Sequence, residues 1–197
     1  MTPEAHVGDV MEAAAVDVSS GEPPDPIARL VTEGRHRDAL GACAQAHGGV
    51  LGRLCMALLG SQADADEATQ ETLLRAHRGM AGYRTEGSIK AWLCGIARHV
   101  CAHMLETRRK QRELLEVVPV GEEGRDVFVQ RRRSRALRDA LGKLKPTERE
   151  ALVLRYVAEL SHREIAAVCN LDEPTTRKRI SRALARLRTV MPDQEIE

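Results

Sequence analysis

The chain has 197 residues, of which 43% are hydrophobic, so it can form one medium-sized domain or two small ones with real cores. Its 30 Lys and Arg residues nearly balance its 29 Asp and Glu residues, which excludes a uniformly basic or acidic protein. The five Cys residues form no CxxC pair, no apolar run reaches membrane-spanning length, and the N-terminus shows no signal-peptide pattern. We therefore expect a cytoplasmic protein with reduced thiols and no membrane insertion.

Charge is unevenly distributed along the chain. Residues 1–28 carry six acidic side chains and no Lys or Arg, whereas residues 131–145 carry seven Lys or Arg and one acid. This polarity is typical of a protein that meets both a polyanion and a positively charged partner. Residues 1–34 contain Pro and Gly and show only weak helical periodicity. They are therefore predicted to be an acidic, largely disordered extension.

Two helices are predicted next, over residues 35–59 and 63–77. In the first, apolar residues recur at helical spacing, Gly48 and Gly49 are expected to loosen or interrupt the helix, and Gly60 is expected to end it. The second carries an acidic face with these members: Asp64, Asp66, Glu67, Gln70 and Glu71. Acids near a helix start are favoured by the helix dipole, so the spacing alone fits a solvated helix as well as a binding face.

A glycine-rich loop over residues 79–87 and a helix with a continuous apolar stripe follow. The loop holds one aromatic residue, and the helix is basic on its other side. Such a pair can receive an extruded base and follow a nucleic-acid backbone. The candidate side chains are Tyr83, Arg84, Thr85, Lys90, Trp92 and Arg98.

Residues 113–130 contain Pro and Gly without clear periodicity and are predicted to be a linker. The linker separates a first domain over residues 35–112 from a second over residues 131–191, with a tail over residues 192–197. The predicted fold class is all-α, with two small helical domains joined by a flexible linker.

The second domain is predicted to contain a helix-turn-helix. Thr147 and Glu150 have capping-box spacing and are expected to open a helix over residues 148–157. Ser161 and Glu164 repeat this spacing before a short helix. The order of capped helices and a short turn favours a DNA-binding motif over an ordinary helical bundle.

The last predicted helix is preceded by a break at Asn170 and begins with the cap Asp172. Its inward stripe is Ile180, Leu184, Leu187 and Met191. Its polar and basic candidates for DNA contact are Pro174, Thr175, Arg177, Lys178, Arg179 and Arg182. An apolar rear and a basic front suit docking in the major groove, where early residues reach base edges and later Arg residues hold phosphates.

Two sets of motifs resemble the bacterial extracytoplasmic-function (ECF) sigma factors of the sigma-70 family. Residues 64–76, DADEATQETLLRA, and residues 87–98, GSIKAWLCGIAR, are similar to sigma region 2. Residues 144–187, which include LSHREIA at 160–166, are similar to sigma region 4. The resemblance covers roughly residues 40–190 and implies two helical domains that bind core RNA polymerase and promoter DNA.

The resemblance also implies roles for individual surfaces. It assigns the acidic face to the β′ clamp helices of polymerase, with further contact to the β subunit. It assigns the glycine-rich loop and the following helix to the −10 element, and residues 174–182 to the −35 element. It further implies an anti-sigma factor, which could hold the chain at the membrane, and it implies no cofactor, catalytic residue or metal ligand. Glu173 and Pro174 replace the small apolar-glycine pair usual in the family, so the promoter sequences do not follow from it.

Histidines and cysteines raise a separate hypothesis, a metal or redox switch. His99 and His103 stand at i and i+4 and could begin a metal site. Cys101 points away from His99 on a helix, and Cys94 is too far from Cys101 for a disulfide. Structural roles are therefore favoured for these residues.

Two other classes of function stay open. A helix-turn-helix regulator could bind DNA without polymerase, although the acidic face would then have no role. A pure interaction module, such as a scaffold that titrates a regulator, is the third reading. An enzyme is not expected, because no nucleophile, base and orienting group cluster in one motif.

Overall fold

The computed structural model describes residues 25–83, 87–115, 137 and 139–191. The named helices are α1 (Pro26–Thr32), α2 (His36–Leu59), α3 (Gln62–Gly79), α4 (Ile89–Leu115), α6 (Pro146–Tyr156), α7 (His162–Cys169) and α8 (Glu173–Val190), with a 3-10 turn at Met80–Gly82. The described residues contain no strand, and the predicted all-α fold class is confirmed. No helix in these residues is long and apolar enough to cross a membrane.

Helices α2, α3 and α4 pack on one another and form the first bundle. Its fully buried core side chains include Leu51, Leu54, Ile89 and Leu93. The predicted interruption at Gly48 and Gly49 is wrong, because α2 runs unbroken through both residues. Each helical Gly costs about 1 kcal/mol relative to Ala, which the packing of α2 against two long helices offsets.

Gly60 ends α2 as predicted. Its φ of 78° lies in the left-handed region, and its N–H donates to the carbonyl of Met56 at 2.9 Å. Glycine adopts this conformation without the steric cost that a β-carbon brings. The chain can therefore turn sharply from α2 into α3.

Helix α1 corrects the prediction of a disordered extension over residues 1–34. Asp25 caps the helix by accepting the N–H of Ile27 at 2.9 Å, and the side chains of Ile27 and Val31 are buried in the core. So short a helix shows little periodicity and gains its stability from packing on α2. The rest of the predicted extension, residues 1–24, lies outside the described residues.

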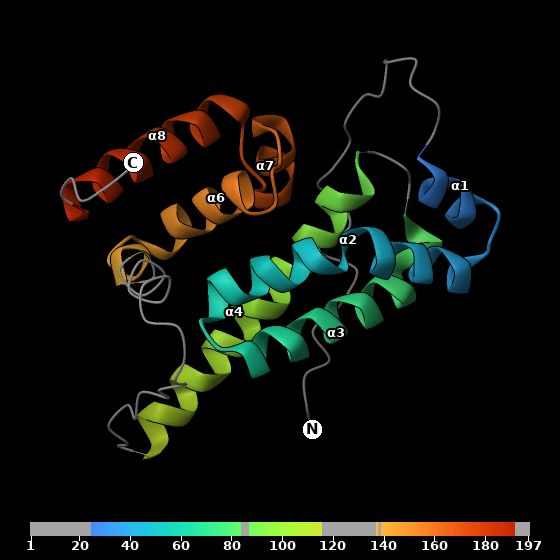
Figure 1. The fold of residues 1–197 in the computed structure, drawn as a ribbon, viewed down its shortest axis with the longest axis horizontal. Coiled ribbons are helices and arrows are strands. Elements are labelled where there is room, and N and C mark those ends of the chain that lie inside the picture. The colour runs from blue at the N-terminus through green and yellow to red at the C-terminus, as the bar shows by residue number, and fades with distance from the viewer. Residues whose placement is uncertain (1–24, 84–86, 116–136, 138, 192–197) are drawn as a thin grey trace, which may run out of the picture.

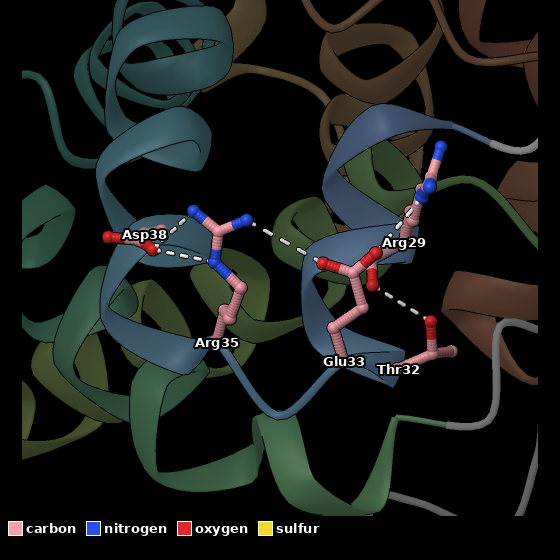
Figure 2. A network of polar contacts seen from close by, with 5 residues as sticks. All are labelled: Arg29, Thr32, Glu33, Arg35 and Asp38. Carbon is pink, nitrogen blue, oxygen red and sulfur yellow. Dashed lines mark hydrogen bonds and ion pairs between the residues drawn. The ribbon is translucent and has the colours of Figure 1, made fainter.

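Exposed ion pairs join the end of α1 to the start of α2, as Figure 2 shows. Glu33 pairs with Arg29 at 3.0 Å and with Arg35 at 3.6 Å, and Arg35 also pairs with Asp38 at 2.8 Å. Exposed pairs contribute about 0–1 kcal/mol each. The buried apolar side chains of α1, rather than these charges, therefore hold it on α2.

Helices α6, α7 and α8 form a second group, which Figure 1 shows together beside the first bundle. Helix α4 ends at Leu115, so the first three residues of the predicted linker are helical. The remaining linker, residues 116–130, and the predicted tail, residues 192–197, lie outside the described residues. The boundaries that were predicted for the two domains otherwise stay predictions.

The predicted start of α6 is wrong. Lys145 is the N-cap and Pro146 occupies the first turn, so Glu148, not Glu150, accepts the N–H of the cap residue, at 3.4 Å. The fixed φ of proline favours the first helical position, which sets the start earlier than the Thr147 pattern indicates. Glu148 also pairs with Arg186 of α8 at 2.8 Å, which joins α6 to α8.

The capping box that opens α7 is confirmed. The N–H of Ser161 donates to Glu164 at 2.7 Å, and the N–H of Glu164 donates back to the Ser161 hydroxyl at 3.2 Å. The cap of α8 is confirmed as well, since Asp172 accepts the N–H of Thr175 at 2.7 Å. The predicted stripe of α8 fails at Met191, which is 39% exposed because the helix ends at Val190.

Asn170 offers a test of the turn between α7 and α8. It has a φ of 52°, in the left-handed region that Asn tolerates better than other residues with a β-carbon. We expect Asn170→Ala to lower the free energy of unfolding by about 1 kcal/mol. Asn170→Gly should leave it nearly unchanged. Urea denaturation measures both variants, and equal stability of the two would show that the turn is not conformationally strained.

Candidate functional site

The predicted acidic face lies on α3 beside a groove between α3 and α4. Asp66, Glu67 and Gln70 are exposed, and Glu71 is half-buried and pairs with Arg75 at 2.7 Å. The groove has a volume of about 260 Å³, and its lining consists of Glu67, Gln70, Glu71, Leu74, Arg75, Val100, His103 and Met104. Leu74 is 50% exposed there, so the surface combines acids with apolar side chains.

Asp64 is separated from this acidic face, which corrects its predicted grouping. Its side chain is buried and forms an ion pair with Arg108 of α4. The hydrogen bond from Arg108 holds the pKa of Asp64 below its usual range, although burial acts in the opposite direction. Asp64 therefore joins α3 to α4, while the other four acidic-face residues remain at the surface.

Replacing Asp64 tests this structural role. We expect Asp64→Asn to lower the free energy of unfolding at neutral pH by about 1–3 kcal/mol, because the Arg108 pair is lost. Asp66 lies two residues further along the chain and is exposed, so Asp66→Asn should change the free energy of unfolding little.

The same pair gives a dependence on pH. The lowered pKa means that the unfolded chain takes up the Asp64 proton more readily than the folded one. The stabilisation is therefore complete above the ordinary pKa of Asp and is lost as the pH falls toward the lower folded value. Thermal melts across acidic pH should show a shallower loss of stability in Asp64→Asn than in the wild type. Parallel curves would contradict the assignment.

Tyr83 and Trp92 form an aromatic pair where the loop meets α4. Their ring centroids lie 5.0 Å apart at 45°, and the Tyr83 hydroxyl donates to the carbonyl of Gly87 at 2.8 Å. Burial raises the pKa of Tyr83 to about 12, so its hydroxyl is protonated at neutral pH. Arg84 and Thr85, the other predicted loop contacts, lie outside the described residues.

Lys90 and Arg98 lie on the polar side of α4, as predicted, and this side faces the C-terminal helices. The Nζ of Lys90 donates to the carbonyl of Glu159 at 3.4 Å, and Arg98 pairs with Glu150 of α6 at 2.6 Å. Both basic residues therefore have partners from the second group of helices.

Ser88, at the start of α4, adds a third contact to the same side. Its hydroxyl donates to Glu164 of α7 at 2.5 Å and also accepts the N–H of Ala91 at 3.1 Å. We call the three contacts, made by Ser88, Lys90 and Arg98, the interhelical cluster. Sequence reasoning missed the acidic partners, because Glu164 was identified only as a cap and nothing local marks Glu150 as a partner of α4.

The basic side of α8 faces solvent. Of the predicted −35 candidates, Arg179 is half-buried, and the exposed ones are Pro174, Thr175, Arg177, Lys178 and Arg182. The opposite side buries Thr176, Ile180 and Ala183. Arg177 pairs with Glu173 at 2.5 Å, which holds its guanidinium beside the helix start. The structure thus brings the −35 candidates together on one surface.

The cysteines and histidines do not gather into a metal site, although the buried thiols of Cys55 in α2 and Cys101 in α4 are hydrogen-bonded to each other. Burial raises the pKa of Cys43 to about 11 and that of Cys94 to about 12, so both thiols are protonated at neutral pH. Among the described residues, no group of three or more His, Cys, Asp or Glu is arranged to hold a metal ion. His99 instead contacts the neighbouring Arg98 at 3.3 Å, and His103 lines the α3–α4 groove.

Comparison with known proteins matches the two groups of helices to two known sequence regions. The model of Sigma-70 region 2 matches residues 43–112, and that of Sigma-70, region 4 matches residues 134–187. The ECF RNA polymerase sigma factor SigC of Mycobacterium tuberculosis (strain CDC 1551 / Oshkosh) is 33% identical over 135 residues, covering 65% of this chain and 70% of SigC. This chain belongs to the ECF sigma factors.

Other similar proteins extend the match. The ECF sigma factor BldN of Streptomyces coelicolor is 29% identical over 162 residues, covering 79% of this chain but only 61% of BldN. Among solved structures, CnrH in complex with the cytosolic domain of CnrY gives a TM-score of 0.64 at 24% identity, covering 83% of this chain and 94% of that one. RpoE in complex with the anti-sigma factor NepR from Bartonella quintana gives a TM-score of 0.57 at 22% identity, covering 84% of this chain and 99% of that one. The ECF fold is thus shared across these proteins.

Proposed function

We propose that this ECF sigma factor binds core RNA polymerase and directs promoter-specific initiation through the −10 and −35 elements, without catalysing a reaction itself. The observation that carries the proposal is the pairing, on one chain, of a solvent-facing basic recognition helix with an exposed acidic and apolar groove. The first suits DNA and the second suits a protein partner. A helix-turn-helix regulator would need only the first surface, so that alternative is not favoured.

Polymerase would dock on the groove between α3 and α4. Asp66, Glu67 and Gln70 offer exposed polar groups, and Glu71 is held against Arg75 at the groove edge. Exposed Leu74 supplies apolar area that a charged rim can surround. These residues are proposed to meet the β′ clamp helices, and further contact with the β subunit is part of the proposal.

Promoter DNA would meet two different surfaces. The start of α8 would enter the major groove at the −35 element, with Arg177 and Lys178 near base edges and Arg182 on phosphate. The −10 element must be melted before its bases can be read individually. Its unpaired strand would lie along the start of α4, beside the aromatic pair of Tyr83 and Trp92, with Arg84, Thr85, Lys90 and Arg98 as further contacts.

An anti-sigma factor is a further proposed partner. CnrH and RpoE, which share this fold, were solved with CnrY and with the anti-sigma factor NepR. An inhibitor that covers the polymerase or DNA surfaces of this chain would keep it inactive in the cytoplasm, or at the membrane if the inhibitor is anchored there.

Charge reversal on the groove tests the polymerase surface. We expect Glu67→Lys to weaken binding to core polymerase at least several-fold, because complementary charge orients docking. Glu33→Lys, an equal change at the C-cap of α1 and outside the groove lining, should leave binding unchanged. A pull-down at about 0.15 M salt compares the two, where the Debye length is about 8 Å. Equal binding by both variants would remove this face from the interface.

The recognition helix gives a second test. Arg177→Ala should alter preference at one or two positions of the −35 element by about 1–3 kcal/mol each. Arg182→Ala should weaken binding to all sequences alike and reduce the slope of log affinity against log salt by about 1. Binding to a randomised −35 library measures both effects. A uniform loss in both variants would mean that Arg177 does not read bases.

Transcription in vitro tests the function as a whole. Core polymerase with this chain should start RNA at specific sites on a library of genomic fragments, and core polymerase alone should not. DNA binding without initiation would support the helix-turn-helix regulator instead. Polymerase binding without DNA binding or initiation would support an interaction module.

A further inference from the structure

Two buried thiols from different helices meet in the core of the first bundle. Cys55 belongs to α2 and Cys101 to α4, and the exposed fractions of these residues are 0% and 1%. The two thiols are hydrogen-bonded to each other, so their sulfur atoms need only a small further approach to form a disulfide. Sequence spacing does not reveal this pair, because all of α3 lies between the two helices along the chain.

The shared hydrogen bond makes the two thiols chemically unequal. The hydrogen bond from Cys101 lowers the pKa of the Cys55 thiol, against the opposing effect of burial. The same hydrogen bond, together with burial, raises the pKa of the Cys101 thiol. Because the thiolate is the nucleophile, Cys55 is the member of the pair that attacks an oxidant, and Cys101 is the member that keeps its proton.

The end of α2 gives an oxidant its route to the pair. Cys55 lies one turn before the last residue of the helix, Leu59, and the left-handed Gly60 then turns the chain toward α3. The ends of helices open at a lower free energy than their middles. A brief opening there admits hydrogen peroxide, which is little larger than water, more readily than a bulky disulfide such as oxidised glutathione. Burial therefore selects a small peroxide as the oxidant.

We propose that Cys55 and Cys101 are a peroxide-oxidised pair that closes into a disulfide between α2 and α4. The Cys55 sulfur attacks hydrogen peroxide: an S–O bond forms, the O–O bond breaks, and the leaving oxygen takes the thiol proton and departs as water. The Cys101 sulfur then attacks this sulfenic acid: the S–S bond forms, the S–O bond breaks, and the hydroxyl leaves with the Cys101 proton as a second water. Two thiols are oxidised, and one peroxide is reduced to two waters.

The disulfide would act as a covalent staple across the first bundle. It joins two helices between which the whole of α3 is looped out, and a cross-link that closes a long loop removes much conformational freedom from the unfolded chain. The oxidised bundle should therefore resist unfolding better than the reduced one. This inference goes beyond the proposed function and does not depend on polymerase or DNA binding.

Peroxide treatment of the full chain, followed by alkylation and mass spectrometry, tests the pair. Every sample carries Cys169→Ser, which removes the thiol that is not fully buried. Trypsin places Cys55 and Cys101 on separate peptides, residues 54–75 and 99–108, and the other two buried cysteines on two further peptides. We expect hydrogen peroxide to cross-link the first two peptides and dithiothreitol to release them. Thiols that both stay open to alkylation, sulfinic acid on either one, or a disulfide to another cysteine would overturn the proposal.

Variants separate this pair from general oxidation of the core. Cys55→Ala and Cys101→Ala should each abolish the cross-link, whereas Cys43→Ala, which removes another buried thiol, should keep it. In Cys101→Ala a sulfenic acid should accumulate on Cys55, where dimedone traps it. Cross-linking should raise the Tm by several degrees in the chain with both thiols, and dithiothreitol should reverse this rise. A Tm that stays level or falls would mean that the folded bundle must distort to form the bond, which would overturn the preformed pair.

Discussion

Helix α4 is the constraint on which the rest of the structure depends. One side carries Leu93 and Ala97 into the core with α2 and α3. Its other side presents Lys90 and Arg98 to the second group of helices. Because one rigid helix serves both purposes, the position of the C-terminal helices and the accessibility of the basic side are coupled. Separation of the two groups would therefore uncover the polar side of α4.

The ion pair between Asp64 and Arg108 holds α3 against α4. It joins the first turn of α3 to the C-terminal half of α4 and thereby sets the two walls of the groove side by side. The nearby acids Asp66 and Glu67 do not share this structural role, since both remain exposed. A nearly neutral chain thus separates its charges by surface: acids border the groove, and basic residues cover α8.

Local signals made much of the fold predictable. The cap pairs of α7 and α8 involve residues three apart, so the sequence alone identified Ser161 with Glu164 and the cap Asp172. Helix α1 was missed because its stability comes from burying Ile27 and Val31 against α2. The pairs of Asp64 with Arg108 and of Arg98 with Glu150 join distant parts of the chain, and one sequence contains no signal for them.

The distance between the two groups of helices, measured in the free chain and in the transcription complex, tests the account most directly. Spin labels on Ala46→Cys in α2 and Ala185→Cys in α8 would report it, with Cys169→Ser to remove the one native thiol among the five that is not buried. We predict one short distance in the free chain and a longer one with core polymerase and promoter DNA. The same distance in both states would contradict the account.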